Sequence, residues 1–228
     1  MNRVIIKRKK EKYYIEEAFK SLRTNIQFCG EDKKVIAFTS AIPGEGKSSV
    51  SLNLAVSLAE AGKKVLFIDA DLRKSVLTGT VEINEKISGL THFLAKQATL
   101  QEIINSTNVP DLYLIMAGPV PPNPAELLGR AIFNEMLEIA RKVYDYIIVD
   151  TPPLGSVIDS AIIAERCDGA VLVIESGVVS YRFVQNIKKQ LDKSNCPILG
   201  TVINKAEHSQ SGRYGQQYGK YSFEGRGR

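Results

Sequence analysis

The sequence lacks the cysteine patterns that mark disulfide scaffolds, zinc sites and iron–sulfur clusters. It has three cysteines, an odd number, and Cys29, Cys167 and Cys196 lie far apart with no CxxC spacing among them. A reducing, cytosolic compartment is the simplest interpretation of this cysteine usage.

Long apolar runs are also missing. No run approaches the roughly 18 residues that a membrane-spanning helix needs. The N-terminal sequence MNRVIIKRKKEK carries charge but lacks the apolar stretch of a secretory signal. We therefore expect a cytoplasmic protein whose contact with the inner face of the cell membrane is peripheral or made through a partner.

No linker rich in proline, serine or glycine divides the middle of the chain, which favours one domain. The 228 residues are 44% hydrophobic and 24% charged, as is normal for one globular domain with a sizeable core. The net charge of +5 fits an anionic partner, and it does not choose among a nucleotide, a nucleic acid and an acidic membrane.

Three zones follow one another along the chain. Residues 1–32 form a basic N-terminal arm and then a predicted helix, from near Tyr14 to Phe28, whose apolar residues recur at helical spacing. Residues 33–206 alternate short apolar runs with amphipathic stretches. Residues 207–228 are polar and rich in glycine, and we expect them to be a flexible tail.

The central zone predicts an α/β fold with a mostly parallel sheet flanked by helices, because strands and helices alternate in it. The predicted strands are Val35–Thr39, Lys64–Asp69, Leu112–Met116, Tyr146–Asp150, Gly169–Ile174 and Ile198–Ile203. The predicted helices are Lys47–Glu60, Ala131–Lys142, Asp159–Glu165 and Tyr181–Leu191.

A phosphate-binding loop is predicted between the first of these strands and the helix that begins at Lys47. The motif G-x-x-x-x-G-K-[ST] is matched by Gly46, Lys47 and Ser48, with Ala41 in place of the first glycine. This loop makes residues 33–206 a single P-loop NTPase domain that binds ATP and Mg²⁺. Backbone N–H groups at such a helix start wrap phosphates, so the residues expected to contact the nucleotide are Pro43, Gly44, Glu45, Gly46, Lys47, Ser48 and Ser49.

Acidic residues end two of the predicted strands. Asp150 has the position of a Walker B metal holder, with a turn or helix-capping role as the alternative. Asp69 and Asp71 are spaced so that both side chains point the same way from an extended segment, and solvated turn acids are the alternative. Ligands of such sheets bind at the carboxyl ends of the strands, so we expect all three acids near the phosphate site.

The sequence favours ATP over GTP. Asn204-Lys205-Ala206-Glu207 lacks the final aspartate of the guanine-reading motif, and Pro153 stands where GTPases of this class place a glycine. Asn204 is a candidate for contacting adenine, with a turn-forming role as the alternative. Septum-site and plasmid-partition ATPases carry a signature lysine where this chain has Ile42, which argues against their mechanism.

The chain resembles the bacterial tyrosine kinases of capsule and exopolysaccharide synthesis, in the cytoplasmic form whose membrane adaptor is a separate chain. The resemblance covers essentially the whole chain. It is carried by PGEGKS, IDADLRK, GPVPPNPAELL and VDTPP, which begin at residues 43, 68, 118 and 149, and by a C-terminal cluster of tyrosines.

The resemblance implies roles for the site residues. Lys47 holds the phosphates, while Ser48, Asp71 and Asp150 hold the metal. Asp69 accepts the tyrosine proton, which a carboxylate assists because an unperturbed phenol has a pKa near 10. Arg73 is a candidate for charge neutralisation, with a surface salt bridge as an equal alternative.

The family also uses an E-x-x-R-x-x-R motif on an N-terminal helix for ring-forming contacts. Glu17, Lys20 and Arg23 match it, with lysine in place of the first arginine. Lysine keeps the charge but loses the bidentate fork, so the resemblance implies a homo-oligomeric ring of uncertain strength. A solvated charged face is the alternative.

The tail carries Tyr214, Tyr218 and Tyr221 in a segment too polar to fold. We predict that they are autophosphorylation sites offered to a neighbouring subunit, with a simply disordered tail as the alternative. The family implies a membrane-embedded chain-length adaptor that activates the kinase, and a cognate phosphotyrosine phosphatase.

The basic run before Tyr13 fits anionic lipid or a plain solvated arm. It has no interleaved aromatic residues, so we expect no nucleic-acid partner.

Two other functions compete with the kinase. One is an assembly-switch ATPase of the partition or septum-site type that makes no tyrosine product. The other, a nucleic-acid-binding partition protein, rests only on the net charge. The tyrosine tail and Ile42 favour the kinase over both.

Overall fold

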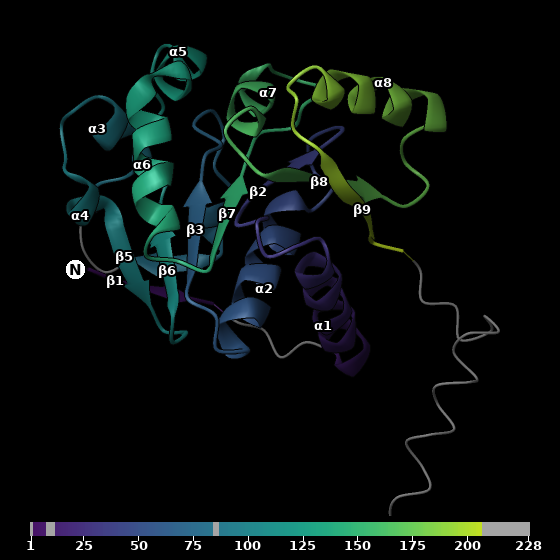
Figure 1. Ribbon diagram of the computed structural model, residues 1–228, viewed down its shortest axis with the longest axis horizontal. Helices are drawn as coiled ribbons and strands as arrows, with labels where there is room; N and C mark the ends of the chain where they lie inside the picture. Colours follow the sequence, from purple (N-terminus) through teal and green to yellow (C-terminus); the bar gives the residue numbers. More distant parts are fainter. Residues whose placement is uncertain (1, 8–11, 84–86, 207–228) are drawn as a thin grey trace, which may run out of the picture.

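The computed structural model describes residues 2–7, 12–83 and 87–206, which form one nine-stranded sheet between two layers of helices (Figure 1). The strands are β1 (Arg3–Ile6), β2 (Val35–Ser40), β3 (Val65–Asp69), β4 (Val81–Ile83), β5 (Ile104–Thr107), β6 (Leu112–Ile115), β7 (Tyr146–Asp150), β8 (Gly169–Glu175) and β9 (Ile198–Asn204). The helices are α1 (Tyr13–Phe28), α2 (Lys47–Glu60), α3 (Leu90–Leu94), α4 (Leu100–Ile103), α5 (Pro124–Gly129), α6 (Ala131–Arg141), α7 (Asp159–Ala164) and α8 (Tyr181–Asp192), with a 3₁₀ turn at Leu77–Gly79.

The sheet has the strand order β4-β1-β5-β6-β3-β7-β2-β8-β9. Only the β1–β4 and β5–β6 pairs are antiparallel among the described strands, so the predicted fold class, α/β with a mostly parallel sheet, is confirmed. The strands on either side of β7 are β3 and β2, which places the three predicted site strands next to one another at the centre of the sheet.

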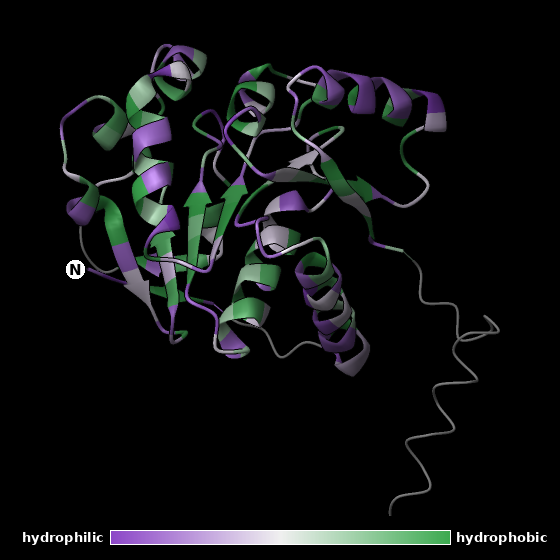
Figure 2. Cartoon of the chain, in the orientation of Figure 1, coloured by the Kyte–Doolittle hydropathy of each residue, from purple (hydrophilic) through white to green (hydrophobic). Residues whose placement is uncertain are grey.

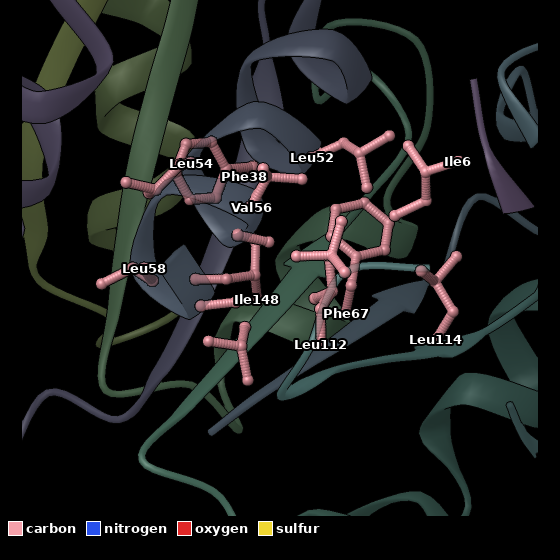
Figure 3. Packing of buried hydrophobic residues seen from close by; sticks show 14 of the residues in the cluster. Ile6, Phe38, Leu52, Leu54, Val56, Leu58, Phe67, Leu112, Leu114 and Ile148 are labelled. Atoms are coloured by element: carbon pink, nitrogen blue, oxygen red, sulfur yellow. The ribbon is translucent and has the colours of Figure 1, made fainter. Parts of the chain in front are cut away.

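Alternate residues of the central strands face opposite helix layers. Phe38, Phe67 and Ile148 belong to one buried cluster with residues of α2, and Figure 3 shows this cluster with Leu52, Leu54 and Leu58 of that helix. The intervening residues of the same strands pack against α3, α5, α6 and α7 on the other face. Both faces of these strands are therefore buried, which is why they read as continuous apolar runs in the sequence. Figure 2 shows this apolar centre and the more polar outer helices, α8 above all.

Six strands and five helices lie where the sequence predicts them. The helix α2 begins at Lys47 and ends at Glu60 as predicted, and the other predicted elements agree to within one or two residues. The strands β4, β1 and β5, the first three in the sheet order, were not predicted. They have three or four residues each, and β5 is the polar sequence Ile-Asn-Ser-Thr, too short and too polar to show a strand period.

Part of the predicted basic N-terminal arm is a strand. Residues 3–6 are a strand between β4 and β5, and the side chains of Val4 and Ile6 are buried in the core on the α2 face. Two apolar side chains at alternate positions stabilise this short strand in spite of the basic residues that follow. The boundaries of the three zones, at residues 32 and 206, remain predictions.

Among the residues that the structure describes, no helix combines the length and the apolar character that crossing a bilayer requires.

Candidate functional site

The candidate site lies at the carboxyl edge of β2, β3 and β7. Asp69, the last residue of β3, is in register with Asp150, the last residue of β7, and Asp150 is also in register with Phe38 of β2. Figure 1 shows β3 and β7 ending side by side. The predicted convergence of the two strand-end acids follows from this register.

The phosphate loop runs from Ala41 to Gly46, which is the residue before α2. Gly44 has φ 88° and Gly46 has φ 84°, a left-handed conformation that residues with a Cβ rarely adopt. A Cβ on Gly44 would meet nothing within 4 Å, whereas a Cβ on Gly46 would lie 2.2 Å from Nδ2 of Asn204. Gly46 is therefore required both by its backbone angle and by the close approach of Asn204.

Glu45 holds the loop in shape from inside. Its side chain is buried, and its two carboxylate oxygens accept hydrogen bonds from the backbone N–H of Ile42 at 2.9 Å and of Glu175 at 3.1 Å. Because the side chain is turned into the protein, a nucleotide contact of Glu45 can come only from its backbone.

The last strand braces the loop from the other side. Nδ2 of Asn204 donates to the carbonyl oxygen of Glu45 at 2.9 Å. Nζ of Lys205 lies 2.8 Å from the carbonyl oxygen of Gly44 and 2.8 Å from a carboxylate oxygen of Glu175. Asn204 thus has a bracing contact that the sequence did not reveal, and its contact with adenine remains a prediction.

Lys47 points inward and forms an ion pair with Asp150. Its Nζ lies 2.6 Å from Oδ1 of Asp150 and 3.1 Å from Oγ of Ser48, and both members of the pair are buried. Oγ of Ser51, one helical turn after Lys47, donates to the same Asp150 oxygen at 3.2 Å. Sequence reasoning did not single out Ser51, although its place four residues after Lys47 puts it on the same helix face.

Asp69 is a buried carboxyl group beside a second one. Oγ of Ser75 donates to its Oδ2 at 2.5 Å, and the backbone N–H of Asp71 donates to its Oδ1 at 3.3 Å. Burial, followed by the negative charge of Asp150, raises the pKa of Asp69 from its ordinary value of 3.8 to about 7. A carboxyl group with this pKa exchanges a proton readily near neutral pH, as a general base must.

Asp71 shapes the turn that follows β3. Its Oδ1 accepts hydrogen bonds from the backbone N–H groups of Arg73, at 3.2 Å, and Lys74, at 3.0 Å. The Arg73 guanidinium binds both oxygens of Asp159, so the salt-bridge alternative for Arg73 is present in the structure, and its role in charge neutralisation stays a prediction. Sequence reasoning did not single out the side chains of Ser75 and Asp159, because each meets the site through tertiary contacts.

The donor set fits Mg²⁺. Ser48, Asp71 and Asp150 offer hydroxyl and carboxylate oxygens, the hard ligands that this ion prefers. Among the described residues, no three or more His, Cys, Asp or Glu side chains are grouped to hold a metal ion. A magnesium ion here would therefore complete its shell with phosphate oxygens and water, as is usual at phosphoryl-transfer sites.

The predicted oligomer residues lie on α1. Lys20 pairs with Glu17 at 2.7 Å on the exposed face of the helix. Arg23 is used within the chain, because its Nη1 donates to the carbonyl oxygen of Ser57 at 2.8 Å and so ties α1 to α2. The role of the three residues between subunits stays a prediction. The predicted phosphoacceptors Tyr214, Tyr218 and Tyr221 lie outside the described residues.

The loop geometry predicts different results for its two glycines. Gly44→Ala should cost about 1–2 kcal/mol of stability, because a left-handed alanine is strained but has room. Gly46→Ala should also displace Asn204 and weaken nucleotide binding at least about tenfold, measured by fluorescent-nucleotide titration.

Removing the obstructing side chain is the control for this prediction. Gly46→Ala combined with Asn204→Ala should regain part of the stability lost by Gly46→Ala, measured by thermal unfolding. Equal effects of Gly44→Ala and Gly46→Ala on both readouts would contradict this account of the loop.

The chain is similar to known proteins over most of its length. A family model described as an AAA domain matches residues 33–196. Tyrosine-protein kinase CpsD of Streptococcus agalactiae is 49% identical over 207 residues, which cover 90% of each chain. Tyrosine-protein kinase YwqD of Bacillus subtilis is 40% identical over 220 residues, which cover 94% of this chain and 92% of that protein.

The chain is also similar to solved structures, to different degrees. The chimerical protein CapA2B2 matches with a TM-score of 0.80 and 31% identity, over 89% of this chain and 92% of that one. The kinase domain of the Escherichia coli tyrosine kinase ETK matches with a TM-score of 0.78 and 34% identity, over 87% and 80%. The septum site-determining protein MinD from Pyrococcus horikoshii, complexed with Mg-ADP, is less similar, with a TM-score of 0.65 and 26% identity over 78% and 72%.

Proposed function

Because this chain belongs to the family of bacterial tyrosine-protein kinases built on a nucleotide-binding P-loop domain, we propose that it transfers the γ-phosphoryl group of ATP to tyrosines of its own C-terminal segment, with Asp69 as the proton acceptor. The observation that carries the proposal is the buried Asp69 carboxyl, in register with Asp150, which is the ion-pair partner of the phosphate-loop lysine. A partition-type ATPase is the weaker alternative, because MinD is less similar in both sequence and structure.

Binding of the nucleotide begins with the loop. The backbone N–H groups of residues 44–48 surround the phosphates at the start of α2, where the helix dipole also favours anions. Lys47 exchanges its contact with Asp150 for the β- and γ-phosphates. The ammonium group then neutralises phosphate charge, and Asp150 is left free to bind a cation.

The metal-binding part of the site is formed by Ser48, Asp71 and Asp150. When bound, Mg²⁺ would neutralise charge on the phosphate oxygens. The chain's contribution is to hold these oxygen donors at one edge of the sheet, with Ser51 keeping Asp150 in place.

Transfer breaks the bond between the γ-phosphorus and the bridging oxygen of ATP and forms a bond to the tyrosine oxygen. The phenolic proton passes to Asp69, and ADP leaves with the electron pair of the broken bond. Asp69 is suited to this step because its pKa of about 7 lies near the working pH, where a positioned base is most effective.

The acceptors proposed for this reaction are Tyr214, Tyr218 and Tyr221, reached in trans from a neighbouring subunit. Support for a ring through Glu17, Lys20 and Arg23 comes from the family resemblance. Each phosphate adds a charge of about −1.5 to −2. Because the chain has a net positive charge, this added negative charge can change how the subunits associate.

Three further proposals concern the cell. A membrane-embedded adaptor of capsular or exopolysaccharide synthesis recruits and activates the kinase at the inner face of the membrane, and a phosphotyrosine phosphatase reverses its action. The likeness to the chimerical protein CapA2B2 supports a partner of this kind.

Phosphotyrosine mapping after incubation with Mg·ATP tests the proposed acceptors. The triple variant Tyr214→Phe, Tyr218→Phe and Tyr221→Phe should lose at least nine-tenths of the incorporated phosphate. Tyr181→Phe is the matched control, since Tyr181 is 78% exposed but lies at the start of α8. Phosphate found mainly outside residues 207–228 would exclude the tail as the substrate.

A further inference from the structure

Arg73 and Asp159 form a two-point ion pair beside the candidate site. Nε of Arg73 donates to Oδ2 of Asp159 at 2.8 Å, and Nη2 donates to Oδ1 at 2.9 Å. The Asp159 side chain is fully buried, whereas that of Arg73 is 41% exposed. Such a fork fixes both the distance and the angle between the two segments that it joins.

The Asp159 end of the pair is anchored to the segment after Asp150. Ser160, next to Asp159 in α7, donates through its hydroxyl to the carbonyl oxygen of Pro152. Oγ1 of Thr39 in β2 donates to the same carbonyl at 3.0 Å. The start of α7 is therefore held against the strands that carry the phosphate loop and Asp150.

The Arg73 end of the pair lies within the turn that presents the other two acids. The backbone N–H of Arg73 is one of the two groups that bind Oδ1 of Asp71. Ser75, two residues further on, donates to Asp69. Moving the Arg73 side chain therefore moves the turn on which the contacts of both Asp69 and Asp71 depend.

We propose that Arg73 and Asp159 are positioning residues for phosphoryl transfer, which fix the turn of residues 71–75 relative to Asp150. The proposal rests on the proposed function, because it assigns a role within the same site. The alternative is that Arg73 contacts the phosphates directly. The two-point contact with Asp159 favours a positioning role instead. If Arg73 left to bind phosphate, it would strand a buried carboxylate without its cation, which is costly.

The test measures steady-state phosphotyrosine formation and ADP formation in the same reactions, for the full chain. Arg73→Ala and Asp159→Asn should each lower kcat about 10–100-fold, because small misplacements of reacting groups cost this much. KM for ATP should change less than about twofold, since the phosphate loop is untouched. The double variant, which leaves no unpaired buried charge, should fold and be no slower than the slower single variant. Arg73→Lys should recover part of the rate, because lysine keeps the charge but not the fork.

The control is another arginine–aspartate pair, which is half-buried and lies at the amino ends of the strands. Nη1 of Arg141 binds Oδ2 of Asp168 at 2.7 Å, and Asp168 in turn accepts from the backbone N–H of Val35 at the start of β2. Arg141→Ala should lower the unfolding temperature and leave kcat of the folded protein at the wild-type value.

Two outcomes would overturn the proposal. Wild-type kcat in Asp159→Asn together with a slow Arg73→Ala would assign Arg73 a direct contact with substrate. Wild-type kcat in all the Arg73 and Asp159 variants would leave the pair a purely structural role. ADP formation without phosphotyrosine in the wild type would instead defeat the proposed function, and the ADP rates of the variants would still test the pair.

Discussion

Replacement of Asp69 with asparagine is expected to lower the rate of tyrosine phosphorylation by about 10²–10⁴-fold, the range for loss of a general base. The same change should make the protein more stable at pH 8. Asparagine keeps the shape of the buried group and an oxygen that can accept from Ser75, but it carries no charge that burial and Asp150 disfavour.

The sign of the stability effect follows from the pKa of Asp69. Its pKa is about 7 in the folded chain and its ordinary value is 3.8, so between these pH values the folded state binds more protons than the unfolded state. The free energy of unfolding of the wild type therefore falls as the pH rises through this window. Raising the pKa from 3.8 to about 7 corresponds to about 4 kcal/mol of unfolding free energy. The wild type loses this full amount only above pH 7.

Thermal unfolding of the wild type and Asp69→Asn at several pH values measures this effect. The variant should melt several degrees higher than the wild type at pH 8, and the difference should vanish below about pH 4. Asp192→Asn is the control, since Asp192 has only an exposed pair with Lys188 and should change neither stability nor rate. Unchanged phosphorylation by Asp69→Asn, or lower stability at pH 8, would contradict the assignment of Asp69.

Replacement of Lys47 with methionine is the second prediction with a large effect. Phosphotyrosine formation should fall by about 10²–10³-fold or more, because a preorganised cation for the phosphates is removed. The variant should also lose stability, since Asp150 stays buried and keeps only Ser51 as a side-chain hydrogen-bond partner among the described residues. An unpaired buried charge costs about 3–5 kcal/mol.

The two effects of Lys47→Met can be separated. Lys47→Arg keeps a cation for Asp150 and should retain most of the stability, yet remain strongly impaired, because a planar fork does not replace a compact ammonium group in the loop. Rates are compared well below the melting temperature of each variant. Wild-type phosphorylation by Lys47→Met, with the fold intact, would show that the phosphate loop does not serve the reaction.

The centre of the fold could be predicted from sequence because burial leaves a simple pattern. Strands such as β2 and β3 are buried at every position, so they appear as short runs rich in Val, Ile and Phe. The strand β1 could not be recognised, because two buried residues, Val4 and Ile6, are too few for a periodic signal inside a basic segment.

The site was predictable where local sequence determines geometry. Lys47, Asp69 and Asp150 each occupy a strand end or helix start, so their meeting follows from the topology of a parallel sheet. Their partners were not predictable. Asp159 lies 86 positions from Arg73, and one of the two backbone N–H groups that donate to the inward-turned Glu45 carboxylate belongs to the distant Glu175.

The fate of the γ-phosphate tests the central claim most directly. The protein is incubated with Mg·ATP labelled in the γ-phosphate, with and without a peptide of an activating adaptor tail, and label is counted in phosphotyrosine and in inorganic phosphate. The account predicts label in phosphotyrosine for the wild type and its loss in Asp69→Asn and Lys47→Met. Label recovered only as inorganic phosphate under every condition would contradict it and identify the chain as an ATPase without kinase activity.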